Sequence, residues 1–281
     1  IGLAHDLGNP PFGHQGEASM QQWFKKKQGE DQKANPDAKI ENDFIAFDGN
    51  AQTFRLLTSL QVLNDDFGLN LTVATLAALI KYPPIYGAEK YGYKKWGVFD
   101  SEKAIADEVW AETGLGPGIR HPLTVIMEAC DDIAYSVIDA EDTVKKACAS
   151  FYDLMDFIDS ASDDPVSKTI VDKARKENGE FKKAKLSSRE LNDVSMQIFR
   201  AVAISKMVKS ATDTFVGNID KIMSGEQGLN FELIKKSDCG IFCKVVKDFD
   251  SRYGFQHHDV LRLELQGHNY IQSMMDMQWY S

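Results

Sequence analysis

The chain has 281 residues, 43% of them hydrophobic and 26% charged, a composition typical of a soluble globular protein with a sizeable core. Its formal net charge of -10 argues against broad electrostatic attraction to nucleic acid or an anionic membrane, so an anionic ligand would need local cations or a metal. The four cysteines show no CxxC spacing, which favours a reduced, cytoplasmic protein without a zinc ribbon. No apolar run approaches the roughly 18 residues of a membrane helix.

Helical periodicity runs through almost the whole chain and predicts an all-α fold. In chain order, the predicted helices cover residues 16–28, 48–63, 70–83, 101–114, 121–149, 188–212, 212–225, 230–250 and 257–278. Between them, the sequence predicts a flexible polar stretch over 29–39, a loop over 84–100 that is rich in Gly, Tyr and Lys, and a surface loop within 160–188.

Helix start and stop signals refine these boundaries. Ser101 is the predicted N-cap of a helix that ends at Gly114 or Gly116, and Pro122 falls in the first turn of the longest helix. The chain opens at Ile1 inside a helical pattern and stops at Ser281 without a helix stop signal. Both ends therefore predict a truncated protein.

The stretch "AHDLGNPPFGHQGE", residues 4 to 17, combines a sharp turn with groups that bind metals or move protons. Its glycines and prolines are explained by a helix stop and a turn. His5, Asp6, His14 and Glu17 are not explained in that way. A divalent cation needs ligands that converge from different elements, so a His5–Asp6 metal site requires a third ligand from elsewhere in the chain.

The helix predicted over 121–149 offers that ligand. Asp131, Tyr135 and Asp139 are spaced i, i+4, i+8 and so lie on one stripe of the helix. Acidic residues on a helix usually form a solvated face, and this is the interpretation we give to Asp132, Glu141 and Asp142. A carboxylate, a phenol and a second carboxylate in register instead fit a metal ligand followed by two groups that bond a polar ligand.

Five motifs follow one another along the chain: "AHDLGNPPFGHQGE", "DGNAQTFRLLTSL", "LIKYP", "KKWGVFDSEK" and "MEACDDIAYSVIDAEDT". Together with "VLRLELQGHNYIQSMMD" at 260–276, they resemble the deoxyguanosine triphosphate triphosphohydrolase family, the dNTP triphosphohydrolase branch of the HD-domain metalloenzymes. The first and fifth motifs are specific, whereas "LIKYP" alone is weak. The resemblance implies an HD-domain helical bundle with additional C-terminal helices, a single domain over 1–281 with core motifs in 1–150 and a C-terminal helical region over 188–281.

The resemblance also implies roles for individual residues. His5, Asp6 and Asp131 match the family's metal ligands, with Mn²⁺ or Mg²⁺ as the expected ion, and a fourth ligand, an upstream His, has no counterpart in this chain. His14 and Glu17 match the catalytic pair, in which the His acts as general acid/base or as nucleophile. The matched substrate-binding residues are Asn50, Lys81, Tyr82 and Lys95 for the phosphates, where Lys95 aligns better than Lys94, and Tyr135 and Asp139 for the sugar.

The implied reaction is metal-dependent hydrolysis of dGTP, or of other dNTPs, to deoxynucleoside and inorganic triphosphate. The alternatives are another HD-type phosphohydrolase, such as a nucleotidase or guanosine tetraphosphate hydrolase, and a nucleotide-sensing module without turnover. Base preference is left open by the sequence. The family resemblance further implies a dimer-based homo-oligomer, up to a hexamer, with single-stranded DNA as a candidate regulator and no membrane partner.

Overall fold

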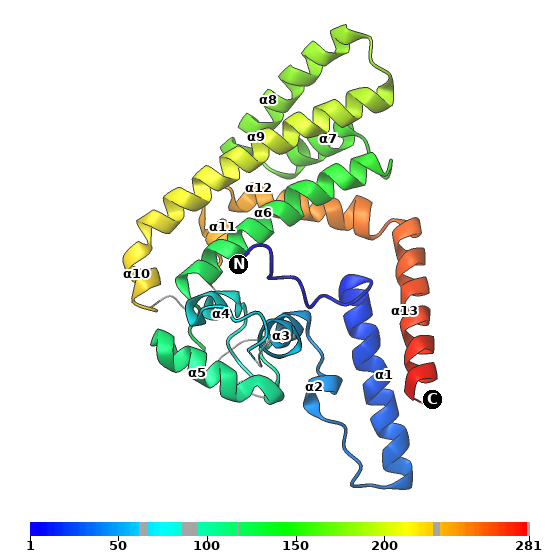
Figure 1. Ribbon diagram of the computed structural model, residues 1–281. Helices are drawn as coiled ribbons and strands as arrows, with labels where there is room; N and C mark the ends of the chain where they lie inside the picture. The colour runs from blue at the N-terminus through cyan, green and yellow to red at the C-terminus, as the bar shows by residue number, and fades with distance from the viewer. Residues whose placement is uncertain (62–66, 86–94, 117, 227–230, 280–281) are drawn as a thin grey trace. The chain divides into compact units, whose positions relative to one another are not determined.

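The computed structural model describes residues 1–61, 67–85, 95–116, 118–226 and 231–279 (Figure 1). Within these ranges every regular element is a helix, and extended backbone pairs only in an isolated bridge between Ile85 and Val98. The predicted all-α class is confirmed. Among the described helices, none has the length and apolar character needed to cross a membrane.

Contacts within the chain define two compact units. The first contains Ile1–Thr124 together with Arg262–Ser281, and the second contains Val125–Leu261. Each unit has its own hydrophobic core. The domain organisation implied by the family resemblance stays a prediction.

The first unit is built from short helices around a core that includes Phe54, Leu57, Val98 and Trp110. Its elements are α1 (Gly13–Ala34), α2 (Asn42–Ile45), α3 (Gly49–Arg55) with a following π-helical turn (Leu56–Leu60), α4 (Val73–Leu79), a 3₁₀ turn (Asp100–Glu102), α5 (Lys103–Thr113) and most of α13 (His258–Trp279).

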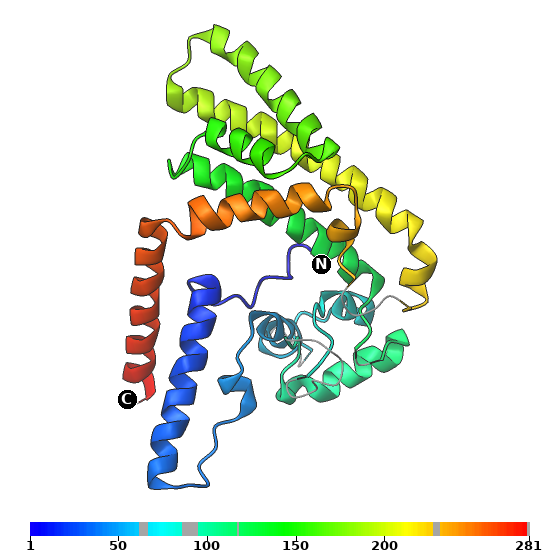
Figure 2. The ribbon, with the colours of Figure 1, turned by 180° about the vertical axis from the view of Figure 1, so that it is seen from behind.

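Helices α1 and α13 are far apart in sequence and lie side by side in both views (Figures 1 and 2). Trp23 Nε1 donates to Asp276 Oδ1 at 2.7 Å, and Ser19 Oγ lies 2.7 Å from His268 Nδ1. A Cβ at Gly267 would come within 2.6 Å of the Phe12 ring, so the close approach of the two helices requires glycine there.

The second unit is formed by longer amphipathic helices around a core that includes Val137, Leu154, Ile170, Phe199 and Phe242. Its elements are α6 (Pro122–Lys145), from Val125 onward, and then α7 (Phe151–Ala161), α8 (Pro165–Phe181), α9 (Ser188–Gly217), α10 (Ile219–Met223), α11 (Leu233–Lys236) and α12 (Gly240–Phe249), which continues into a π-helical turn (Asp250–Phe255). Complete capping boxes at Ser150 and Ser187 fix the starts of α7 and α9.

The region 160–188 was predicted to contain a surface loop. Most of it is instead helical, because α8 occupies Pro165–Phe181. Its charged composition hides a narrow apolar stripe of Ile170, Val171 and Ala174, which is buried while the remaining faces are polar. Asp164 caps the helix start by accepting from the Ser167 backbone N–H at 2.8 Å.

Three boundary predictions also need correction. The stretch predicted to be flexible over 29–39 is helical as far as Ala34, where α1 carries an i, i+4 ion pair between Lys27 and Asp31 at 3.1 Å. Ser101 does not cap α5, since its hydroxyl donates to Asp43 Oδ2 at 2.5 Å. Residues 1–8 form turns and not the end of a helix. Gly114 ends α5 as predicted, with a φ of 68°.

Candidate functional site

The N-terminal turn, residues 1–8, is held against the start of α3. The Gly8 backbone N–H donates to Thr53 Oγ1 at 2.9 Å, and Thr53 Oγ1 lies 3.1 Å from the carbonyl oxygen of His5. A Cβ at Gly8 would lie 2.2 Å from the Thr53 backbone nitrogen. Gly8 is therefore required by close backbone approach, and Thr53 fixes the turn that carries the His-Asp pair.

Within this turn, His5 and Asp6 are arranged as metal ligands would be. His5 Nδ1 donates to the carbonyl oxygen of Gly2 at 2.9 Å, which fixes the orientation of the ring. His5 Nε2 lies 3.4 Å from Asp6 Oδ2. A ring nitrogen bonded to a backbone carbonyl, with the other nitrogen beside a carboxylate, is the usual arrangement of a metal-binding His. The donor set of this pair thus fits a divalent cation.

His14 and Glu17 lie in the first turn of α1, after a sharp backbone reversal at Phe12 (φ 65°) and Gly13 (φ 55°). Glu17 Oε2 accepts from the Gly49 backbone N–H at 3.1 Å, whereas His14 is exposed. Burial and the neighbouring Asp48 carboxylate raise the pKa of Glu17, and the Gly49 hydrogen bond, Lys95 and His14 offset part of that rise. Glu17 is therefore anchored, with His14 and Lys95 close enough to influence its ionisation.

The predicted phosphate-binding residues gather around Tyr82 in the same unit. Lys81 Nζ lies 6.0 Å and Lys95 Nζ 5.9 Å from the centre of the Tyr82 ring. Next to Lys95, the Trp96 indole donates to the carbonyl oxygen of Ala46 at 2.7 Å and holds this segment in place. Lys94, the other lysine considered for this role, falls outside the described residues.

Asn50 lies one residue beyond the Gly49 amide that Glu17 binds. Its side-chain amide donates to Asp48 Oδ1 at 2.9 Å, and its backbone N–H donates to the same oxygen at 2.8 Å. Asp48 is thus the N-cap of α3 and also the anion that raises the pKa of Glu17. The first unit therefore brings the predicted residues together in two linked groups: His14, Glu17, Asn50 and Lys95, and Lys81, Tyr82 and Lys95.

Asp131, Tyr135 and Asp139 lie on α6 in the second unit, on a face that is at least partly exposed. The neighbouring residues Ile133 and Val137 are buried in the core of that unit. Tyr135 is 47% exposed. Burial and Asp142 raise the pKa of the Asp139 carboxyl, and Lys146 and Lys247 partly offset this. The predicted stripe is thus present on the surface of α6.

Sequence reasoning missed Asp250, at the start of the π-helical turn after α12. It is buried, and neither of its carboxylate oxygens has a hydrogen-bond partner. Burial and the Asp139 carboxylate raise the pKa of Asp250 to about 8. Nothing in "KDFDSRY" separates this residue from an ordinary surface aspartate, because the nearby Asp248 has the same sequence character and is exposed.

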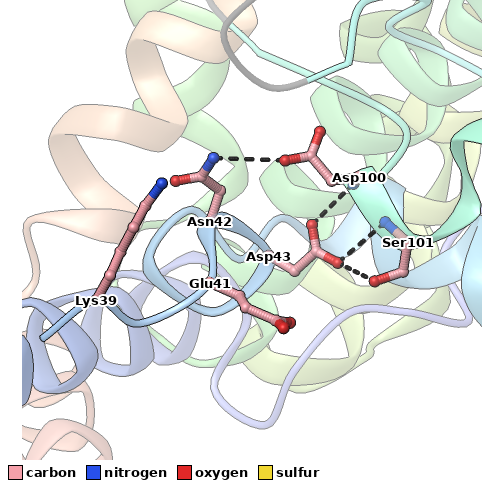
Figure 3. Close-up of a pocket in the computed structure, with 6 residues that line it drawn as sticks. All are labelled: Lys39, Glu41, Asn42, Asp43, Asp100 and Ser101. Atoms are coloured by element: carbon pink, nitrogen blue, oxygen red, sulfur yellow. Dashed lines mark hydrogen bonds between the residues drawn. The ribbon is translucent and has the colours of Figure 1, made fainter.

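A separate hollow of about 340 Å³ lies beside α2, and none of the predicted site residues lines it. Figure 3 shows Asp43 at its floor, where the carboxylate accepts from the backbone N–H groups of Asp100 and Ser101. Behind it, Arg55 pairs with Asp43 at 2.7 Å and with Glu102 at 3.0 Å. The guanidinium also covers the Phe99 ring at 4.2 Å, so Arg55 has a structural role.

Comparison with known proteins finds relatives whose names match the family that the motifs resemble. No family model matches the chain. The chain is 30% identical over 285 residues to the deoxyguanosinetriphosphate triphosphohydrolase-like protein of Listeria monocytogenes, a match that covers 98% of this chain and 60% of that protein. It is 31% identical over 309 residues to the deoxyguanosinetriphosphate triphosphohydrolase of Enterobacter sp. (strain 638), covering 98% and 59%.

The corresponding enzyme of Klebsiella pneumoniae is 30% identical to the chain over 307 residues. The chain spans about 60% of the length of the curated relatives it matches. The names of these relatives describe deoxyguanosinetriphosphate triphosphohydrolases or, for the Listeria protein, a protein like them.

Proposed function

We propose that this chain belongs to the HD-type dNTP triphosphohydrolases and hydrolyses dGTP, or another dNTP, to a deoxynucleoside and inorganic triphosphate. The observation that carries the proposal is the His5–Asp6 pair, in which His5 Nδ1 donates to the Gly2 carbonyl oxygen. The same unit also holds His14, Glu17 and the two lysines beside Tyr82. In the balanced reaction, water adds to the α-phosphorus and the bond from that phosphorus to the 5′-oxygen breaks.

The metal would be held by His5, Asp6 and Asp131. An imidazole and carboxylates are suitable ligands for Mn²⁺, and Mg²⁺ is the alternative expected from the resemblance. When bound, the ion supplies Lewis-acid polarisation of the α-phosphate and lowers the pKa of a bound water.

His14 is the proposed group that moves a proton at the reacting phosphorus. Its exposure in the first turn of α1 leaves the ring accessible to a ligand. Glu17, anchored on the Gly49 amide, lies near His14 and is the proposed group that orients its ring. The His14 ring can then deliver a proton to the 5′-oxygen as the bond to phosphorus breaks.

Lys81 and Lys95 are the proposed partners of the triphosphate. The chain carries a formal charge of -10, so a tetra-anionic substrate must be bound by local cations. Both ammonium groups lie about equally far from the Tyr82 ring, which places two positive charges around one aromatic side chain. Tyr82 and Asn50 add neutral hydrogen-bonding groups.

Asp139 and Tyr135 are the proposed sugar-recognising pair. A carboxylate accepts a hydrogen bond from the 3′-hydroxyl, and a hydrogen bond to a charged group contributes about 1.5–3 kcal/mol. The Tyr135 ring, one helical turn before Asp139, would occupy the space that a 2′-hydroxyl needs. The pair therefore favours deoxyribose over ribose.

The test is a comparison of kcat/KM for dGTP, GTP and 2′,3′-dideoxy-GTP in the full-length protein, with the phosphate product identified by ion chromatography. We expect triphosphate as the product and strong preference for dGTP. Tyr135→Ala should relax the rejection of GTP, and Asp139→Ala should weaken the requirement for the 3′-hydroxyl. Cys130→Ala, at an exposed position of α6 outside the proposed sugar-binding pair, is the matched control and should retain the preference.

Two outcomes contradict the proposal. Release of orthophosphate or pyrophosphate would identify a different HD-type phosphohydrolase. Equal cleavage of the three nucleotides would mean that the α6 stripe is a solvated helix face.

A further inference from the structure

Three metal-binding side chains occur consecutively where the π-helical turn after α12 gives way to α13. His257 Nδ1 lies 3.8 Å from Asp259 Oδ2, and His258 Nε2 lies 3.4 Å from Asp259 Oδ1. The two imidazole rings are 4.5 Å apart between centroids and tilted by 39°. One candidate ligand atom from each residue lies within 4.8 Å of the others. The start of the helix therefore gathers all three side chains on one side of the backbone.

We propose that His257, His258 and Asp259 form a binding site for a divalent transition metal of the zinc, cobalt or nickel type. All three residues belong to the second unit, and none of them is among the predicted ligands of the catalytic metal.

The chemistry of the ligands selects this class of ion. Two imidazoles with one carboxylate suit Zn²⁺, Co²⁺ and Ni²⁺, whereas Mg²⁺ and Ca²⁺ prefer all-oxygen sites. Metal–nitrogen and metal–oxygen bonds of about 2.0–2.2 Å require ligand atoms within roughly 4 Å of each other. The separations of 3.4 and 3.8 Å meet this, although each runs to a different oxygen of Asp259. The three ligand atoms all lie within 4.8 Å of one another, so side-chain rotations must draw them together around the ion.

The two histidines of the site are held only weakly by their surroundings. His257 Nδ1 accepts from the backbone N–H of Asp259 at 3.4 Å, which is long for a hydrogen bond and correspondingly weak. His258 has a side chain that is 81% exposed, so its ring turns without disturbing the core. Three protein ligands also leave room for water, as in open metal sites.

Two features limit the affinity. The positive end of the α13 dipole opposes a cation, although the Asp259 carboxylate offsets that charge. Exposure to water weakens electrostatic attraction further. We therefore expect binding in the micromolar range, too weak for a structural zinc and suited to an ion that exchanges with its surroundings.

The experiment is equilibrium dialysis of metal-stripped full-length protein against micromolar ZnCl₂, with bound zinc measured by plasma mass spectrometry. His258→Ala should bind one equivalent less than wild type. Gln256→Ala, an exposed neighbour without a metal ligand, is the matched control and should bind as much as wild type. Circular dichroism should show the same helix content in all variants.

A second background separates this site from the proposed catalytic metal. In Asp131→Ala the zinc lost on changing His258 should still be one equivalent, whether or not the catalytic site binds metal. Equal zinc content in wild type and His258→Ala would overturn the inference. So would a loss of zinc in Gln256→Ala as large as that in His258→Ala.

Discussion

Replacing Asp250 with Asn should stabilise the protein, and the gain should depend on pH. Asp250 is buried with both carboxylate oxygens lacking hydrogen-bond partners, and it lies close enough to Asp139 for the two charges to repel. The folded protein therefore keeps this carboxyl protonated up to about pH 8, whereas the unfolded chain ionises it near the ordinary value of 3.8. Asn keeps the shape of the neutral acid and cannot ionise.

The size of the effect follows from proton linkage. Since the pKa of Asp250 is raised in the folded state, the folded state holds this proton more tightly than the unfolded chain. The contribution of Asp250 to the unfolding free energy is therefore highest below pH 4 and falls as pH rises towards 8. Each pH unit in this window removes about 1.4 kcal/mol of unfolding free energy. The Asn variant escapes this loss. Relative to wild type it should gain about 2 kcal/mol at pH 5 and about 4 kcal/mol at pH 7, with little further gain above pH 9.

Urea denaturation at pH 5, 7 and 9, followed by circular dichroism, measures these differences. Asp248→Asn is the matched control, because Asp248 lies two residues earlier, in α12, and is exposed. The control should change the unfolding free energy by less than about 0.5 kcal/mol at every pH. An Asp250→Asn variant whose advantage over wild type is the same at pH 5 and pH 7 would refute the reasoning, since Asp250 would then ionise normally in the folded protein.

Three other changes test separate parts of the structure. Gly8→Ala forces a Cβ into the backbone of α3 and should lower the unfolding free energy by at least about 2 kcal/mol, measured by chemical denaturation. Arg55→Met leaves Asp43 and Glu102 buried without their cation and should lower the unfolding free energy by about 3–5 kcal/mol in the same assay. If Arg55→Lys retains most of the wild-type stability, the guanidinium is not needed to bind both carboxylates at once. His14→Ala should lower kcat by about 10²–10⁴-fold while nucleotide binding, followed by calorimetry, persists; a loss below tenfold would remove His14 from the reaction.

Much of the helical architecture could be predicted because the signal is local. The stripe of buried residues on α6 and the stop at Gly114 follow from spacing and from one residue's backbone preference. The helix α8 was missed because its buried apolar stripe is narrow and its other faces are polar. The capping role expected of Ser101 failed for a different reason: Asp43, far away in sequence, binds the same hydroxyl.

The candidate site shows the same division. The motif around His5 and His14 could be read directly, because its turn residues and its chemical groups occur together. The contacts that fix it could not. Thr53 and Gly49 of α3 form hydrogen bonds with Gly8 and Glu17 of the motif, and no local pattern in the sequence indicates these contacts. Asp250 is the clearest case, since only tertiary packing distinguishes it from Asp248.

The pairing of α1 with α13 has a consequence for the order in which the protein matures. The first unit needs residues 262–281, which are synthesised after the whole of the second unit, whereas residues 125–261 are contiguous and can fold as soon as they emerge. Until then Trp23, whose indole bonds to Asp276 and whose ring packs on Trp279, has no cover and is available to chaperones. A premature stop near residue 260 would therefore harm the helix that carries His14, which lies far upstream of the stop.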